Sequence, residues 1–167
     1  ISLDRGPMIR NTKNLPLRLP DTWMYGAGAA MLVSRELLYM TDGFKVGLGA
    51  GRMNGGTEDT EFLWHASRHA MVEYDGEVAV LHNDVSNFQG LSKKMKQYGR
   101  AIGHLGGMVK NMEGYQYVIG YCSHLERATH VKKDATDSAL SPLRLKVAAA
   151  VAIIETWRVY VVSLILN

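Results

Sequence analysis

An apolar stripe at helical spacing is the clearest pattern in the second half of the chain. Its positions alternate by four and three residues, which predicts an amphipathic helix over residues 91–109. The stripe consists of Leu91, Met95, Tyr98, Ile102, Leu105 and Val109. Glycines are poor helix formers, so those on or beside the stripe indicate that this helix packs closely on another element: Gly99, Gly103, Gly106 and Gly107.

The first half of the chain shows a mixed pattern. The apolar run over residues 23–34 predicts a buried strand, and residues 35–40 predict a short helix closed by an Asp-Gly turn. Apolar spacings of one, three and four predict a helix from 57 to about 69. Two further short strands are expected over 71–74 and 78–82.

The C-terminal run over residues 147–166 is mostly apolar and about as long as a bilayer-spanning helix. Glu155 and Arg158 interrupt it, and at this spacing they could pair with each other. A charge at mid-bilayer costs about 3 kcal/mol. A membrane region, an interfacial helix and a helix packed on protein all remain open. A helix over residues 115–127 and a polar linker over 129–141 are expected before it.

Composition narrows the function classes. The chain has 167 residues, 47% of them hydrophobic, which suits one domain with a real core. A net charge of +3 does not suggest a general nucleic-acid binder. The single cysteine, Cys122, excludes an internal disulfide and a cysteine-based zinc site. Basic residues concentrate after residue 92, which suits either an anionic membrane surface or a solvated helix face.

The candidate chemistry lies in residues 43–59, GFKVGLGAGRMNGGTED, where six glycines precede two adjacent carboxylates. Thr57 is the expected N-cap of the following helix, with Glu58 and Asp59 in its first turn. The positive end of a helix favours an ionised carboxylate, which could serve as a base beside a mobile loop. The alternative is that both acids only complement the helix dipole.

Two weaker candidates complete the set. His82 ends an apolar run and could bind a metal, although a lone histidine is more often a hydrogen-bonded structural residue. Gly26 and Gly28 flank Ala27 within an apolar run, which fits either close packing or approach of a substrate to the backbone. This trio lacks the third glycine of a dinucleotide-binding fingerprint.

The order of these features resembles the second half of a family 2 glycosyltransferase domain. The matching segments are GAGAAMLVSRELLYMTDGF, then LGAGRMNGGTEDTEFLWHASRHAMVEYDGEVAVLH, then a helix containing QYGRAIG. Together they extend over about residues 23–106, half of the chain. The resemblance implies an α/β fold, part of a Rossmann-like GT-A domain without its N-terminal nucleotide-binding half, followed by C-terminal helices. We expect the catalytic half-domain over residues 1–110 and a helical extension over 111–167.

The resemblance also implies inverting transfer of a sugar from a nucleotide-diphosphosugar to an acceptor hydroxyl. Asp59 would be the general base and Glu58 would support it, while the loop of residues 47–56 would close over both substrates. His82 would help to bind a divalent cation, manganese or magnesium, at the diphosphate. The residues expected to contact substrate are Trp23, Gly26, Ala27, Gly28, Arg52, Gly55 and Gly56.

The family binds its nucleotide through an N-terminal region with a DxD motif, and no DxD occurs in this sequence. We therefore expect a segment of a longer polypeptide, inactive alone, with the remaining metal ligands outside it. A carbohydrate or lipid-linked acceptor in surface polysaccharide or glycolipid synthesis and a cytoplasmic location at the inner face of the membrane complete the expectation. The alternative is a non-catalytic, membrane-associated scaffold or interaction module. Metal-dependent hydrolysis is a weaker third reading.

Overall fold

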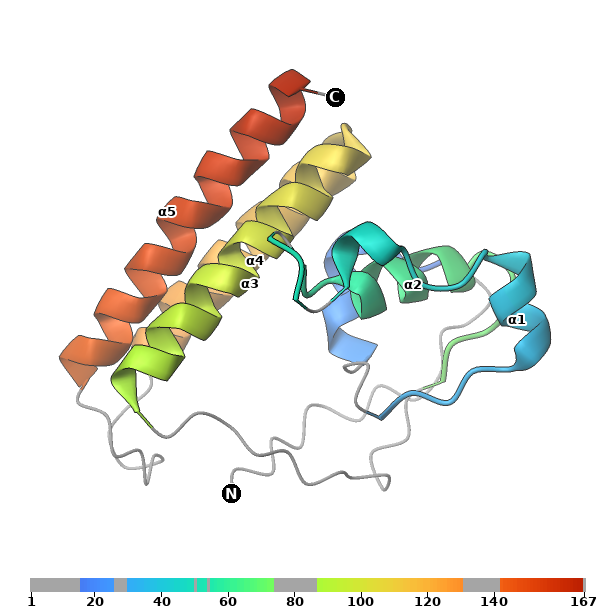
Figure 1. Ribbon diagram of the computed structural model, residues 1–167, viewed down its shortest axis with the longest axis horizontal. Helices are drawn as coiled ribbons and strands as arrows, with labels where there is room; N and C mark the ends of the chain where they lie inside the picture. Colours follow the sequence, from blue (N-terminus) through green and yellow to red (C-terminus); the bar gives the residue numbers. More distant parts are fainter. Residues whose placement is uncertain are drawn as a thin grey trace.

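Helices form all the regular structure in the described part of the chain, as the computed structural model shows (Figure 1). The described residues are 16–25, 30–49, 51–53, 55–73, 87–130 and 142–166. No strand occurs among them, so the expected α/β, Rossmann-like GT-A architecture is wrong for this part of the chain.

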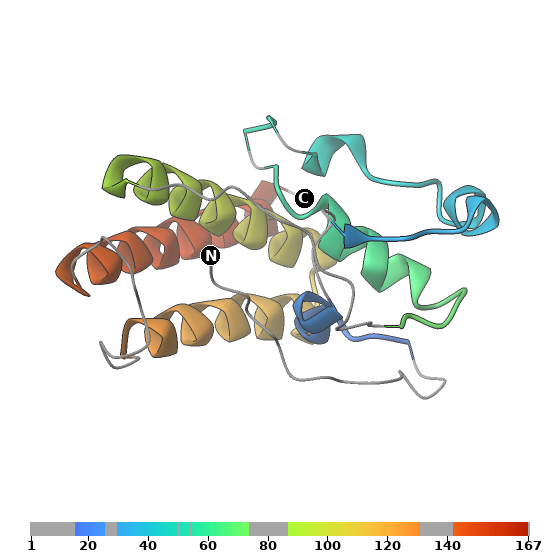
Figure 2. The ribbon, with the colours of Figure 1, turned by 90° about the horizontal axis from the view of Figure 1, so that it is seen from below.

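Three long helices build one side of the molecule: α3 (Phe88–Val109), α4 (Met112–His130) and α5 (Pro142–Leu166). Figures 1 and 2 show α3 and α5 side by side along their lengths, with α4 packed against the pair. The predicted helix over 91–109 is confirmed and begins three residues earlier, where the Asn87 side chain accepts a hydrogen bond from the Gly90 backbone N–H at 2.8 Å. That hydrogen bond caps the first turn of α3.

Glycines set the close approach of α3 to α5, as the stripe predicted. A β-carbon at Gly99 would collide with the carbonyl oxygen of Ala152, and one at Gly103 would collide with that of Thr156. Matching positions advance together along both helices, so α3 and α5 run in the same direction. Such backbone contact between helices needs small residues at the crossing.

An ion-pair cluster lies between the same two helices. Glu155 of α5 pairs with Arg158 at 2.8 Å and with two residues of α3, Arg100 at 3.2 Å and Lys96 at 3.4 Å. The predicted pairing of Glu155 with Arg158 is confirmed. The Glu155 side chain is only 13% exposed, so its charge depends on these cations for compensation.

Replacing Glu155 by glutamine should destabilise the packing of α3 on α5. The change leaves three neighbouring cations without their shared carboxylate, at a cost of about 2 kcal/mol in the free energy of unfolding. Urea unfolding followed by circular dichroism measures this loss. The matched change Glu73→Gln, at an exposed position after α2, should alter stability by less than about 0.5 kcal/mol. Equal effects of the two substitutions would contradict a role for the cluster.

The helix α5 is long and apolar enough, from Leu143 to Leu166, to cross a membrane by length and composition. This property is weakly compatible with membrane association. The helix begins five residues before the predicted start, with Pro142 at its first position, where a proline costs no hydrogen bond.

The N-terminal part contains short elements: η1 (Leu19–Tyr25), α1 (Arg35–Met40), η3 (Val46–Leu48) and α2 (Glu58–Ala66). The short helix predicted over 35–40 is confirmed, and the predicted turn follows it, with both Asp42 and Gly43 at positive φ.

The three predicted strands are not found in the described residues. The run predicted as a strand over 23–34 contributes its first residues to η1, and residues 30–34 are mostly irregular. Residues 71–73 have no regular structure, and 74–86 lie outside the described part. A strand needs a neighbour to satisfy its backbone N–H and C=O groups, and a helical turn satisfies them locally.

A shared core joins the short N-terminal elements to the three long helices. Leu19 of η1, Leu48 of η3, Leu105 of α3 and Tyr117 of α4 form one buried cluster. Glu113 reinforces this junction, because its Oε2 accepts hydrogen bonds from the Leu19 N–H at 3.3 Å and the Trp64 Nε1–H at 3.2 Å. The junction fixes the glycine loop and α2 against the long helices.

Candidate functional site

The two candidate carboxylates lie in the first turn of α2, as predicted. Thr57 occupies the N-cap position, but its hydroxyl makes no capping hydrogen bond. Instead this hydroxyl is buried and has no hydrogen-bond partner among the described residues. The cap prediction is therefore right in position and wrong in its hydrogen bond.

Asp59 is half-buried and turned toward its own helix end. Its Oδ1 accepts a hydrogen bond from the Thr60 backbone N–H at 2.7 Å. Its charge also reaches the buried phenol of Tyr117 on α4: burial is the main cause that raises the pKa of Tyr117, and Asp59 adds to the rise while Thr60 opposes it. Asp59 thus lies where α2 meets α4, next to a neutral hydroxyl.

Glu58 has a different environment. Its Oε2 is buried and has no hydrogen-bond partner among the described residues. A buried, unpaired carboxylate oxygen is costly, so a hydrogen-bond donor such as a water molecule would stabilise it.

The glycine loop is folded back on itself. The Gly56 N–H donates to the Leu48 carbonyl at 2.7 Å, and the Gly55 N–H donates to the Arg52 carbonyl at 3.1 Å. Leu48 is 1% exposed in the shared core, so one end of the loop is anchored. Gly56 has a φ of 126°, which strongly favours glycine, and Gly55 packs too closely on the Gly49 carbonyl for a β-carbon.

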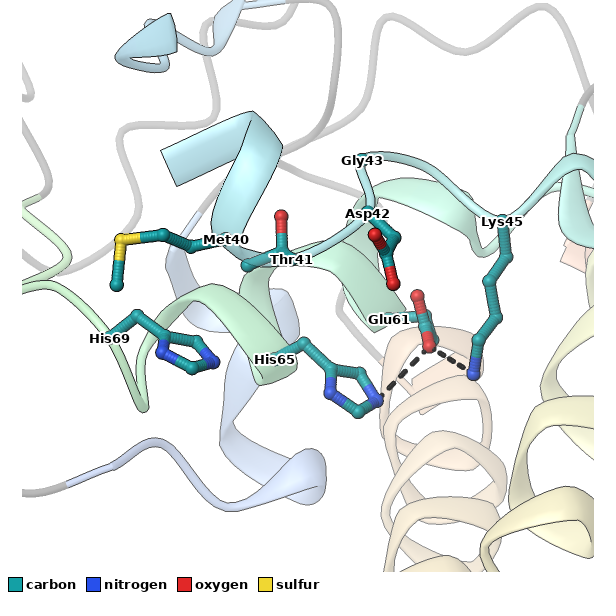
Figure 3. A pocket seen from close by; sticks show the side chains of 8 residues that line it. All are labelled: Met40, Thr41, Asp42, Gly43, Lys45, Glu61, His65 and His69. Carbon is teal, nitrogen blue, oxygen red and sulfur yellow. Dashed lines mark ion pairs between the residues drawn. The ribbon is translucent and has the colours of Figure 1, made fainter. Parts of the chain in front are cut away.

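A pocket of about 280 Å³ opens on another side of α2 (Figure 3). Glu61 is nearly buried there, and its carboxylate pairs with Lys45 at 2.5 Å and with His65 at 3.2 Å. Because Asp59 and Glu61 are about 200° apart around the helix, the pocket does not open onto Asp59. The complete lining is Met40, Thr41, Asp42, Gly43, Lys45, Glu61, His65 and His69.

The Lys45–Glu61 pair ties the segment before the glycine loop to α2, and the stacking of Phe44 on Phe62 at 4.4 Å reinforces this contact. Burial lowers the pKa of the His65 imidazole; Glu61 opposes this effect, while Lys45 and neighbouring cations add to it. The folded state therefore favours neutral His65.

Stability should fall as the pH drops below about 6.5, the ordinary histidine value. In this pH range His65 binds a proton more readily in the unfolded chain than in the folded protein, so acid favours unfolding. We expect His65→Gln to reduce the difference in urea midpoint between about pH 7.5 and about pH 5.5. Part of the difference should persist, because burial also lowers the pKa of His104. An unchanged difference in the variant would contradict this assignment.

The structure brings together only part of the predicted site. Glu58, Asp59, Gly55 and Gly56 are contiguous, and Arg52 is exposed on the glycine loop. Trp23 lies in η1, but its side chain is outside the described part. Gly26, Ala27, Gly28 and His82 also fall outside the described residues.

No group of three or more histidine, cysteine, aspartate or glutamate side chains in the described part could hold a metal. The cation was expected at His82, which lies outside the described residues, so this site stays a prediction. Sequence reasoning missed three residues that position α2: Lys45, Glu61 and Glu113. The spacing of Glu61 and His65 by four was a usable signal, whereas the partners of Lys45 and Glu113 are distant in sequence.

Searches of protein-family models, curated proteins and solved structures each find no match for this chain.

Proposed function

We propose that this chain carries the acceptor side of an inverting sugar transfer, with Asp59 as the general base. The donor would be a nucleotide-diphosphosugar, and the acceptor a carbohydrate or lipid-linked hydroxyl in surface polysaccharide or glycolipid synthesis. The proposed chemistry takes place at the N-terminal end of α2 and requires no β-sheet in the described residues.

The observation that carries the proposal is the position of Asp59. Its carboxylate lies at the positive end of α2, directly after a glycine loop anchored by Leu48. One oxygen accepts a hydrogen bond from the Thr60 N–H, which holds the carboxylate in the first turn of α2. A carboxylate held in a fixed position can act as a general base. The order of motifs around it, quoted above, supports the choice of sugar transfer among base-catalysed reactions.

The proposed transfer forms one bond and breaks one bond at the anomeric carbon of the donor. The Asp59 carboxylate takes the proton of the acceptor hydroxyl while the acceptor oxygen forms a bond to the anomeric carbon of the donor. The bond from that carbon to the nucleotide diphosphate breaks, and the diphosphate leaves with the electron pair. Single displacement inverts the anomeric configuration. A divalent cation would neutralise charge on the leaving diphosphate; the described residues do not form its site, and no step depends on it here.

Substitution of Asp59 by asparagine, with sugar transfer as the readout, tests the proposal. The protein is used as the cell makes it, with any residues that flank this chain. The second candidate function, a non-catalytic membrane-associated scaffold, is favoured by the apolar helix α5. It predicts no binding of a nucleoside diphosphate, which titration calorimetry with UDP and manganese measures directly.

A further inference from the structure

We propose that the outward face of α5 binds the surface of a bilayer that contains anionic lipids, with the helix lying in the plane of the interface. The inference concerns residues distant from Asp59 and holds whether or not Asp59 acts as a base.

Helix α5 has a buried face and an exposed face on opposite sides. The face toward α3 is buried and small, and includes Ala148, Ala152, Thr156 and Ser163. The opposite face is apolar and open along the helix. Its exposed members are Leu143 (71%), Val147 (46%), Ile154 (66%), Val161 (48%) and Ile165 (76%).

These five exposed positions form one line. At about 100° per residue they lie within about 40° of one another, and they extend over about 33 Å of helix. We call them the α5 stripe. Arg158 borders this line between Ile154 and Val161. An exposed apolar line of this length is unusual on a surface that faces only water.

The charges around the stripe favour an anionic lipid surface over a second copy of the chain as its partner. Arg144 and Lys146 lie on either side of its first turn, and each cation near an anionic surface contributes about 1 kcal/mol. A second copy would not supply counter-charge. If two stripes paired in parallel, Arg144 and Lys146 of one copy would face the same cations of the other copy. If they paired antiparallel, these cations would face residues 159–166, which carry no charged side chain.

The middle of α5 favours the interface over a spanning position. Arg158 is 57% exposed at the edge of the stripe, and it shares Glu155 with Lys96 and Arg100 of α3. A spanning helix would place this charged cluster at mid-bilayer, where each charge costs about 3 kcal/mol. In the interface the charges stay near the headgroups.

Trp157 lies beside the stripe, on the side opposite Arg158. The half-buried Trp157 contacts the ring of Tyr160 at 5.7 Å and that of Tyr115 from α4 at 6.3 Å between centroids. Tryptophan prefers the boundary between headgroups and acyl chains, whereas Tyr160 is buried inside the protein. The apolar stripe, the two flanking cations and Trp157 together match the composition of an interfacial helix.

The test is flotation of the purified chain with vesicles of phosphatidylcholine alone or with phosphatidylserine added. We expect Ile154→Ser/Val161→Ser to weaken binding to both vesicles about tenfold or more. Arg144→Gln/Lys146→Gln should weaken binding only where phosphatidylserine is present. Val46→Ser, at a more exposed apolar position near the glycine loop, and Lys110→Gln are controls and should bind like the wild type.

Three results would overturn the proposal. One is equal vesicle binding by the stripe variant and its control. Another is retention of the bound wild type after alkaline carbonate extraction, which indicates a spanning helix. The third is a lipid-free dimer that the stripe variant dissociates without loss of vesicle binding, which assigns the face to a second copy. Asp59→Asn should bind vesicles normally, so failure of this proposal and failure of the proposed transfer are distinguishable.

Discussion

Replacement of Asp59 by asparagine should lower the rate of sugar transfer by about 10²–10⁴-fold, the usual contribution of a general base. Asparagine keeps the size of the side chain and can still accept the hydrogen bond from the Thr60 N–H. It cannot take the proton of the acceptor hydroxyl. The binding of the donor should change little, because the substitution removes a group that acts in the transition state. Turnover with a radiolabelled nucleotide sugar measures the effect.

The control for Asp59 is Asp21→Asn, which removes a carboxylate that pairs with Arg18 at the surface of η1. Such a pair contributes little to stability, so transfer should stay within about twofold of the wild type. Circular dichroism and the urea midpoint establish that both variants fold. Undiminished transfer by a folded Asp59→Asn variant would remove Asp59 from the mechanism, and the scaffold reading would gain support.

The substitution Gly103→Ala should cause the largest loss of stability among the glycine-to-alanine changes in α3. Its β-carbon would meet the carbonyl oxygen of Thr156 and the Tyr160 backbone nitrogen, neither of which can move without displacing α5. Overpacking of this kind costs about 1–3 kcal/mol, and the loss outweighs a gain of about 1 kcal/mol in helix propensity. We expect a net fall in the free energy of unfolding, measured by urea denaturation.

Gly120 of α4 provides the matched control, because it is also helical and a β-carbon there would meet nothing within 4 Å. Gly120→Ala should therefore stabilise the protein by about 0.5–1 kcal/mol. The opposite signs of these two glycine-to-alanine changes distinguish close packing from propensity. If Gly103→Ala stabilised the protein as much as Gly120→Ala, the contact of α3 with α5 would be wrong.

Local patterns explain the successful predictions. The helices expected over 35–40, 91–109 and 147–166 are present because spacing of apolar residues and capping act over a few neighbours. The strand expected over 23–34 is absent from its described residues, 23–25 and 30–34, because an apolar run of that length is ambiguous without a pairing partner. The division of the chain at residue 110 stays a prediction.

The candidate site likewise combines residues that the sequence predicted with contacts that it did not predict. Its acids were visible in the sequence, since Glu58 and Asp59 follow the glycines directly and open a helix. The contact of Asp59 with α4 was not visible, because Tyr117 is 58 residues away in sequence. The same is true of Lys45, whose partner Glu61 becomes apparent only once the segment after α1 lies beside α2 at the pocket (Figure 3).

By itself, the sequence determined where the long helices form, which glycines require close packing, and that a carboxylate pair opens α2. Periodicity, capping and glycine content are properties of neighbouring residues, so they can be read along the chain. Only the tertiary structure decided that the described part is helical, that Leu48 anchors the glycine loop, and that α5 has one buried face and one open apolar face. Those features depend on contacts between distant segments, and burial is a property of the packed molecule.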